Sequence, residues 1–303
     1  MAPNTHQGSS LLVFLCLAGA MALWGSAFIA IKIALNDIPP FALIFLRLIL
    51  GSVFFLAFWR VSFREVVASK DRWLLLLMSI FEPCLYFLFE TKALMYTTAS
   101  QAGVVFAFLP ILILVFSYIL HREKPSFAQV IGGVIAVIGV VILCLSGSPS
   151  ADASSPAFGN FLELLAMASA AVYTVLLKRL SGTYSPFFLA AVQSFTGAIF
   201  FLPFGIYDFA QGVTIDTTSA IAVIYLGLIV TAGAYTLFNI GISKASVAHG
   251  AMYFNLVPIF TIIFSMAFLG ETISFAQLAS MALVVLGVLL GLAPSRQRAI
   301  EAT

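Results

Sequence analysis

Long apolar stretches follow one another along almost the whole chain, and short polar segments separate them. A helix needs about 20 apolar residues to cross the hydrocarbon core of a bilayer, and the chain divides into pieces of about that length. We therefore predict an all-α membrane protein with ten transmembrane helices. Their predicted spans are residues 12–35, 39–59, 73–97, 99–120, 127–146, 157–180, 185–205, 218–241, 246–268 and 273–293.

The composition agrees with a bilayer environment. Hydrophobic residues make up 62% of the chain and charged residues only 9%, and the mean hydropathy is +1.12. Soluble globular domains are far less apolar. No Lys or Arg precedes the first apolar stretch, and its run from Leu11 to Leu35 is too long for a signal peptide. We expect it to be retained as a helix.

Few residues suggest chemistry outside the membrane helices. Cys16, Cys84 and Cys144 all lie within apolar stretches, where cysteine behaves as a small hydrophobic residue. They predict neither a disulfide nor a metal site, and we expect no cofactor. The cations form no basic run with interleaved aromatic residues, so no nucleic-acid partner is expected.

The distribution of Lys and Arg predicts the orientation. Only Lys32 and Lys92 fall on one side, and Arg47 lies within the second helix. Cations concentrate on the cytoplasmic side of membrane proteins, so we expect both termini in the cytoplasm. The eleven cations on the side of the termini are Arg60, Arg64, Lys70, Arg72, Arg122, Lys124, Lys178, Arg179, Lys244, Arg296 and Arg298.

The two halves of the chain repeat each other. The letters SFAQ occur at Ser126 and again at Ser274, and superimposing them also aligns Pro110 with Pro258. We predict two five-helix repeats, at 1–146 and 157–293, with an outer linker at 147–156 and a cytoplasmic tail at 294–303. Because five is odd, the second repeat is expected to be inverted, as in many secondary transporters. Further matches are Glu123 with Glu271, Gly139 with Gly287, Lys32 with Lys178, Pro40 with Pro186 and Gly51 with Gly197.

The repeated letters also have a local meaning. A serine followed three residues later by glutamine is a capping box, in which each side chain bonds a free amide of the helix start. We expect Ser126 and Ser274 each to begin the last helix of a half.

Several motifs carry a resemblance to a known family. They are Trp24-Gly25-Ser26-Ala27-Phe28 with Lys32, Arg47 before Gly51, the A-L-x-Y-T-x-A-S-x-A pattern at 93–102, FLPIL at 108–112, and E-x5-Q before the last helix of each half. The chain resembles the EamA-type drug/metabolite transporters, and within them the bacterial aromatic amino acid exporters. The resemblance implies a ten-helix exporter of small metabolites in the bacterial inner (plasma) membrane. One departure is Arg122 before Glu123, where the second half has Gly270 before Glu271.

The third predicted helix carries the acidic candidates for the site. Glu82, Tyr86 and Glu90 lie at four-residue spacing, which places all three on one helix stripe, and Pro83 is expected to bend the helix. A carboxyl at this depth is a candidate proton site or an anchor for a substrate amine. The alternative is a carboxyl that is neutral, or paired with Arg47 or a nearby lysine, and only fixes the packing. Glu163 is expected near the outer surface, in contact with water.

Aromatic and amide side chains on other helices complete the candidate site. Such residues can orient a small molecule in an apolar cavity, or they can simply bond neighbouring helices to each other. His249 is expected near the cytoplasmic end, in contact with water. With Glu82, Tyr86 and Glu90, the predicted substrate-binding residues are Trp24, Tyr173, Tyr235, Asn239, Tyr253 and Asn255.

The substrate class follows from what the helices lack. A carrier of phosphorylated compounds would need several buried cations, and Arg47 is the only one well inside a predicted span. We expect a small neutral or zwitterionic metabolite, amino acids foremost, with a multidrug or other metabolite permease as the alternative. Motifs of intramembrane enzymes and channel filters are absent from the sequence. Protons are a candidate coupling ion, and the chain is expected to act as a monomer or weak dimer, with the small residues around Gly139 and Gly287 packing within the monomer.

Overall fold

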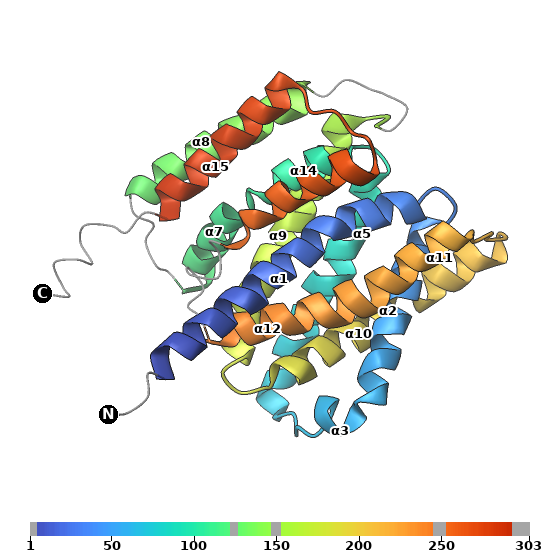
Figure 1. The fold of residues 1–303 in the computed structure, drawn as a ribbon. Helices are drawn as coiled ribbons and strands as arrows, with labels where there is room; N and C mark the ends of the chain where they lie inside the picture. The colour runs from blue at the N-terminus through green and yellow to red at the C-terminus, as the bar shows by residue number, and fades with distance from the viewer. Residues whose placement is uncertain (1–4, 122–126, 147–152, 245–252, 293–303) are drawn as a thin grey trace, which may run out of the picture.

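The structure is a computed structural model that describes residues 5–121, 127–146, 153–244 and 253–292. Throughout these ranges the regular elements are helices, with no β-strand. Figure 1 shows them packed as one bundle. The first half comprises α1 (Thr5–Ala34), α2 (Pro40–Ala57), α3 (Trp59–Ser62), η1 (Ser69–Asp71), α4 (Arg72–Ser79), η2 (Ile80–Leu85), α5 (Tyr86–Leu94), α6 (Ala99–Phe106), α7 (Leu109–His121) and α8 (Phe127–Ser146). The second half comprises α9 (Pro156–Leu180), α10 (Pro186–Ala210), α11 (Thr217–Ile224), η3 (Tyr225–Ala234), α12 (Tyr235–Lys244), α14 (Leu256–Phe268) and α15 (Phe275–Leu292).

The described ranges contain seven helical segments long and apolar enough to cross a membrane. Three shorter apolar helices accompany them, at 130–143, 256–268 and 275–287. The chain is thus an all-helical, multi-pass membrane protein, while the count of ten crossings stays a prediction. The seven long segments are Leu11–Ala34, Pro40–Ala57, Ser69–Leu94, Ala99–Phe116, Pro156–Leu180, Pro186–Ala210 and Thr217–Lys244.

Local sequence signals define several helix starts. Proline occupies the first turn of α2, α9 and α10, where a missing amide hydrogen does no harm. The capping box before α15 is confirmed: Ser274 Oγ accepts from the Gln277 amide at 3.2 Å, and Gln277 Oε1 accepts from the Ser274 amide at 2.8 Å. Its twin at Ser126 lies outside the described residues.

Carboxylates from distant segments cap three further helix starts. Asp208, at the end of α10, accepts from the amides of Phe41 and Ala42 at the start of α2, both at 3.0 Å. Glu65 accepts from the amide of Ser185, which precedes α10, at 2.9 Å. Glu271 accepts from the first two amides of α6, both at 2.9 Å. Negative groups at the positive ends of helix dipoles tie the two halves together.

Helices of one half pack mainly against helices of the other. The cross-half pairs are α2 with α10, α1 with α14 and α12, α9 with α5 and α7, and α8 with α15. Only small residues allow the last pair to approach closely: a Cβ at Gly139 would lie 2.9 Å from the Ser280 carbonyl, and one at Gly287 would lie 2.4 Å from the Gly132 carbonyl. Figure 1 shows α8 and α15 side by side along one edge of the bundle. The small-residue faces therefore pack within the monomer, whereas the inversion of the halves stays a prediction.

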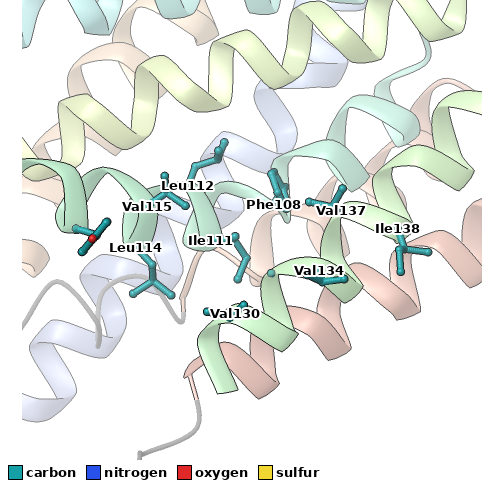
Figure 2. A pocket seen from close by; sticks show the side chains of 11 residues that line it. Phe108, Ile111, Leu112, Leu114, Val115, Val130, Val134, Val137 and Ile138 are labelled. Atoms are coloured by element: carbon teal, nitrogen blue, oxygen red, sulfur yellow. The ribbon is translucent and has the colours of Figure 1, made fainter. Parts of the chain in front are cut away.

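An apolar groove separates this helix pair from α7. It has a volume of about 450 Å³ and is lined by residues of α7 and α8 together with Phe108, as Figure 2 shows. The lining includes Ile111, Val115, Val134 and Ile138, and its one polar side chain is that of Tyr118. Such a surface fits lipid chains and offers almost nothing to orient a polar metabolite, so the candidate site lies elsewhere.

Candidate functional site

The third helical segment is interrupted at the first candidate carboxylate. Glu82 has extended backbone angles, φ −143° and ψ 115°, between two helical stretches. The predicted bend at Pro83 is confirmed, because proline cannot continue the hydrogen-bond ladder. The interruption leaves the Glu82 carbonyl free to accept from Gln193 Nε2 of α10, at 3.4 Å. Non-helical backbone is tolerated at membrane depth where other protein groups satisfy it.

The interruption places Glu82 in a small aromatic pocket. Five of the predicted site residues line this pocket together: Trp24, Glu82, Tyr86, Tyr173 and Tyr235. The free space in it is about 20 Å³, room for about one water molecule. Apart from Trp24 its lining side chains are buried, so the pocket is closed in this conformation and has no room for a metabolite. The other lining residues are Phe106, Leu109, Ala170, Thr174 and Phe254.

Hydrogen bonds and ring contacts fix the pocket side chains. The Tyr235 hydroxyl donates to Glu82 Oε1, which joins the two halves of the chain. The Trp24 ring packs against Tyr235, with the centroids 5.4 Å apart, and stacks on Phe254 at 6.1 Å with the planes 8° apart. The Trp24 indole N–H is buried and has no hydrogen-bond partner among the described residues. A carboxyl acceptor and a donor without a partner among the described residues thus belong to two side chains that line the same pocket.

A second group of polar residues lies beside the pocket. The Tyr86 hydroxyl donates to Glu90 Oε1 at 2.6 Å, which confirms that the two residues share a helix stripe. Arg47 is buried, with Nη1 3.7 Å from Glu90 Oε2 and Nε donating to Thr231 at 3.3 Å. The guanidinium also lies 3.9 Å from the centroid of the Phe87 ring. For Glu90, the paired arrangement considered from the sequence is the one observed.

The remaining predicted site residues lie at different distances from the pocket. Asn239 is buried and accepts from the Tyr173 hydroxyl at 3.3 Å, so it supports a lining residue. Tyr253 is half-buried and its ring contacts Phe14, with the centroids 6.1 Å apart. Asn255 is also half-buried, and neither Tyr253 nor Asn255 lines the pocket, although Phe254 between them does. His249 lies outside the described residues.

The expected contact of Glu163 with water was wrong. Its side chain, on α9, is fully buried in the bundle. Distance from the predicted helix end suggested solvent, but α5 and α7 pack over this part of α9. Phe106 and Phe254 were also missed, because a phenylalanine in an apolar helix carries no signal that separates a pocket wall from the core. The described residues contain no cluster of three or more His, Cys, Asp or Glu side chains placed to hold a metal ion.

The sequence pattern of the EamA-like transporter family matches this chain twice, over residues 11–145 and 157–292. The chain belongs to the EamA-like transporter family. It is therefore a membrane transporter and not an enzyme, and its relatives are likewise named transporters.

Individual EamA relatives cover most of the chain. The transporter YetK of Bacillus subtilis, described as uncharacterized, is 29% identical over 292 residues, which is 94% of this chain and 88% of YetK. An uncharacterized transporter of Archaeoglobus fulgidus is 30% identical, over 93% of this chain and 98% of its own. A probable terminal-alkyne amino-acid exporter of Streptantibioticus cattleyicolor is 24% identical, over 88% of this chain and 89% of its own.

A solved crystal structure shares the fold. It superimposes with a TM-score of 0.67, covers 92% of this chain and 97% of its own, and is 22% identical in sequence. At that identity the likeness concerns the fold alone.

Proposed function

We propose that this protein is a secondary transporter that exports small neutral or zwitterionic metabolites by alternating access, amino acids with apolar or aromatic side chains foremost. The observation that carries the proposal is the small pocket lined by Glu82 and by Trp24, whose indole N–H is buried with no hydrogen-bond partner among the described residues. Transport sites near the bilayer midplane are commonly formed at interrupted helices, and Glu82 lies at such an interruption.

Each part of an amino acid has a counterpart in the pocket. The ammonium group is expected to bind Glu82, and the indole N–H of Trp24 is expected to donate to a carboxylate oxygen. The rings of Phe106, Phe254 and Tyr173 offer surface to an apolar side chain. The family resemblance and the name of the Streptantibioticus relative point to the same substrate class.

The membrane and the direction belong to the same proposal. We expect the protein in a bacterial inner membrane with both termini in the cytoplasm, since the cations concentrate on the side of the termini. Alternating access is supported by the pairing of α1 with α14 and α12 across the halves, which is repeated by α9 with α7 and α5. Exchanging the halves converts one set of contacts into the other.

A permease for lipophilic amines is the second candidate. One observation favours it: no Lys, Arg or His stands among the described residues that line the pocket. A substrate carboxylate would then meet only a neutral donor. Phenylalanine and phenethylamine share the ring and the amine and differ by the carboxylate, so their relative affinity separates the two candidates.

Counterflow exchange in proteoliposomes tests the function. Proteoliposomes that contain the purified protein are loaded with unlabelled phenylalanine, methionine or threonine, and they are expected to accumulate the same labelled compound transiently. Phenethylamine is added outside as a competitor, and its inhibition of this uptake is measured. Trp24→Phe keeps an aromatic ring and removes the indole N–H donor, so it should weaken the binding of phenylalanine more than the binding of phenethylamine. Trp73→Phe is the matched control, since Trp73 is 62% exposed on the surface of α4. Exchange of none of these compounds would contradict the proposal.

A further inference from the structure

Glu163 is a buried acid that the pocket does not use. It lies on α9, its side chain is fully buried, and neither carboxyl oxygen has a hydrogen-bond partner among the described residues. Ala170, a pocket residue on the same helix, lies seven positions later, about 10 Å along the axis. Glu163 therefore stands inside the bundle, about two turns from the pocket.

The groups around Glu163 are few and can be named. Glu90 and Tyr86 of α5 lie within electrostatic reach of it, and Arg47 lies 3.7 Å from Glu90. Lys92 of α5 lies over the Phe41 ring of α2, with its Nζ 5.1 Å from the ring centroid. The other helices packed on α9 add little charge: α6, α7 and α8 contain no Asp, Glu, Lys or Arg, His121 is the last residue of α7, and η2 contributes Glu82. The cations of α4 and α12 are at helix ends, Arg72 at the first residue and Lys244 at the last.

The burial of Glu163 without a partner favours a proton on its carboxyl group. Arg47 and the Tyr86 hydroxyl both bind Glu90, and neither bonds Glu163. A second carboxylate buried next to Glu90 would have neither a cation of its own nor a donor, and such a charge is strongly disfavoured in a low-dielectric interior. The closed bundle therefore favours Glu163 in its neutral, protonated form.

Polar side chains connect this region to one end of the bundle. Asn160 lies one turn before Glu163 on α9 and donates to Gln101 Oε1 at 2.8 Å. The Thr97 hydroxyl donates to Asn160 Oδ1, also at 2.8 Å. All three are buried, and Thr97 adjoins the loop between α5 and α6. This amide cluster is the polar route between Glu163 and the end that the distribution of cations assigns to the outside.

We propose that Glu163 binds the coupling proton of the transporter and that the substrate-free bundle closes only when Glu163 carries it. The proposal rests on the function as a secondary transporter proposed above. With the outer end open, the Glu163 carboxylate takes a proton from water and becomes a neutral carboxyl group, and the bundle can close without burying a second negative charge. With the inner end open, the O–H bond breaks, the electron pair stays on the carboxylate and the proton leaves to water. Glu82 is left free to bind the substrate.

The first test measures coupling in proteoliposomes. In the wild type, an imposed pH gradient is expected to change substrate flux several-fold. Glu163→Gln resembles a permanently protonated residue, so counterflow exchange should continue while its response to the pH gradient falls to the level of empty liposomes. Glu163→Asp restores an acid and should recover part of the response. A full response to the gradient in Glu163→Gln would overturn the proposal.

The second test needs no substrate. Infrared spectroscopy of the purified wild type in detergent at neutral pH is expected to show the C=O stretch of buried carboxylic acids, and Glu163→Gln is expected to remove a component of that band that remains in Glu82→Gln. If the band is unchanged in Glu163→Gln, the proposal is wrong even where transport is seen. If that component is lost but no substrate is exchanged by the wild type, the substrate assignment fails and the proton site stands.

Discussion

The third helical segment of each half contains a stretch of wide turns, which is interrupted in the first half and continuous in the second. In the first half, α4 and α5 flank the wide turns of η2 at Ile80–Leu85, where Pro83 breaks the helix. In the second half, α11 and α12 flank the wide turns of η3 at Tyr225–Ala234, and that stretch contains no proline. An offset of 146 residues places Glu82 opposite Leu228. The wide turns of η2 and η3 are π-helical. π-Helical turns are rare in proteins overall, but they occur often at functional sites.

The difference shows how the site divides its chemistry. The interrupted copy supplies the acids Glu82 and Glu90, whereas the continuous copy supplies the hydroxyl of Tyr235 and the amide of Asn239. The two contributions meet in the hydrogen bond from Tyr235 to Glu82. The candidate site thus takes its acids from one half and its neutral polar groups from the other, so exchanging equivalent residues between the halves should change activity.

The largest expected effect comes from the acid of the interrupted copy. Glu82→Gln keeps the shape and removes the charge, and a hydrogen bond to a charged group contributes roughly 1.5–3 kcal/mol, so counterflow exchange should fall by about 10- to 100-fold. Leu228→Met, at the equivalent position of the other half, is the matched control and should leave exchange nearly unchanged. Equal losses in both variants would show that the two copies do not differ in function.

The partner hydroxyl should have a smaller effect of the same kind. Tyr235→Phe keeps the ring against Trp24 and removes the donor to Glu82. The bond from Tyr235 is only one of several contacts that hold Glu82. Its loss is therefore expected to lower substrate affinity by about 10-fold, as measured by competition in counterflow. Phe89→Tyr adds a hydroxyl at the equivalent position of the first half and should not improve affinity. An unaffected Tyr235→Phe would show that this bond is structural.

Much of this comparison could be predicted from the sequence. The proline at Pro83 and the four-residue spacing of Glu82, Tyr86 and Glu90 predicted the bend and the shared stripe, because both depend only on local geometry. The wide turns of η3 were not predicted, since no proline marks them. They depend on how closely neighbouring helices approach.

The burial of individual side chains also depends on neighbouring helices. Glu163 was expected in water because it lies near the predicted end of its helix, and the sequence does not show which other helices cover it. Tyr253 and Asn255 were included as polar side chains in an apolar helix, whereas the pocket wall is formed by Phe254 between them. Which face of a helix meets the pocket depends on rotation about its axis, and an apolar sequence leaves that rotation almost undetermined.

Two glycines in η3 differ in how closely atoms of other residues approach them. A Cβ at Gly227 would lie 2.5 Å from Leu50 Cβ and 3.1 Å from the Arg47 carbonyl, whereas at Gly233 the nearest atom is the Leu228 carbonyl at 3.7 Å. Gly227→Ala is expected to destabilise the protein by about 1–3 kcal/mol through overpacking against α2. Gly233→Ala should change stability by less than about 1 kcal/mol. Thermal unfolding in detergent measures both, and equal midpoints would show that η3 adapts freely.

The smallest effect is expected at the first residues of the two segments, where their caps differ. Asp216 accepts from the Ser219 amide at 2.6 Å and caps α11, whereas Asp71 before α4 makes no capping bond and accepts from the Tyr184 hydroxyl. The bond from the Ser219 amide lowers the pKa of the Asp216 carboxyl below its ordinary value. A carboxyl whose pKa is lowered by folding stabilises the folded state above its ordinary pKa, and this contribution is lost as the pH falls through the lowered value.

Asp216→Ala should therefore lower the unfolding midpoint slightly at neutral pH, and the difference from the wild type should shrink as the pH is lowered below the ordinary pKa of aspartate. Asp216→Asn keeps an acceptor for the Ser219 amide, so it should recover part of the midpoint and show a weaker pH dependence. Asp71→Asn is the comparison in the other half, where no capping bond exists to be lost. A pH-independent difference for Asp216→Ala would mean that the cap acts through its shape and not through its charge.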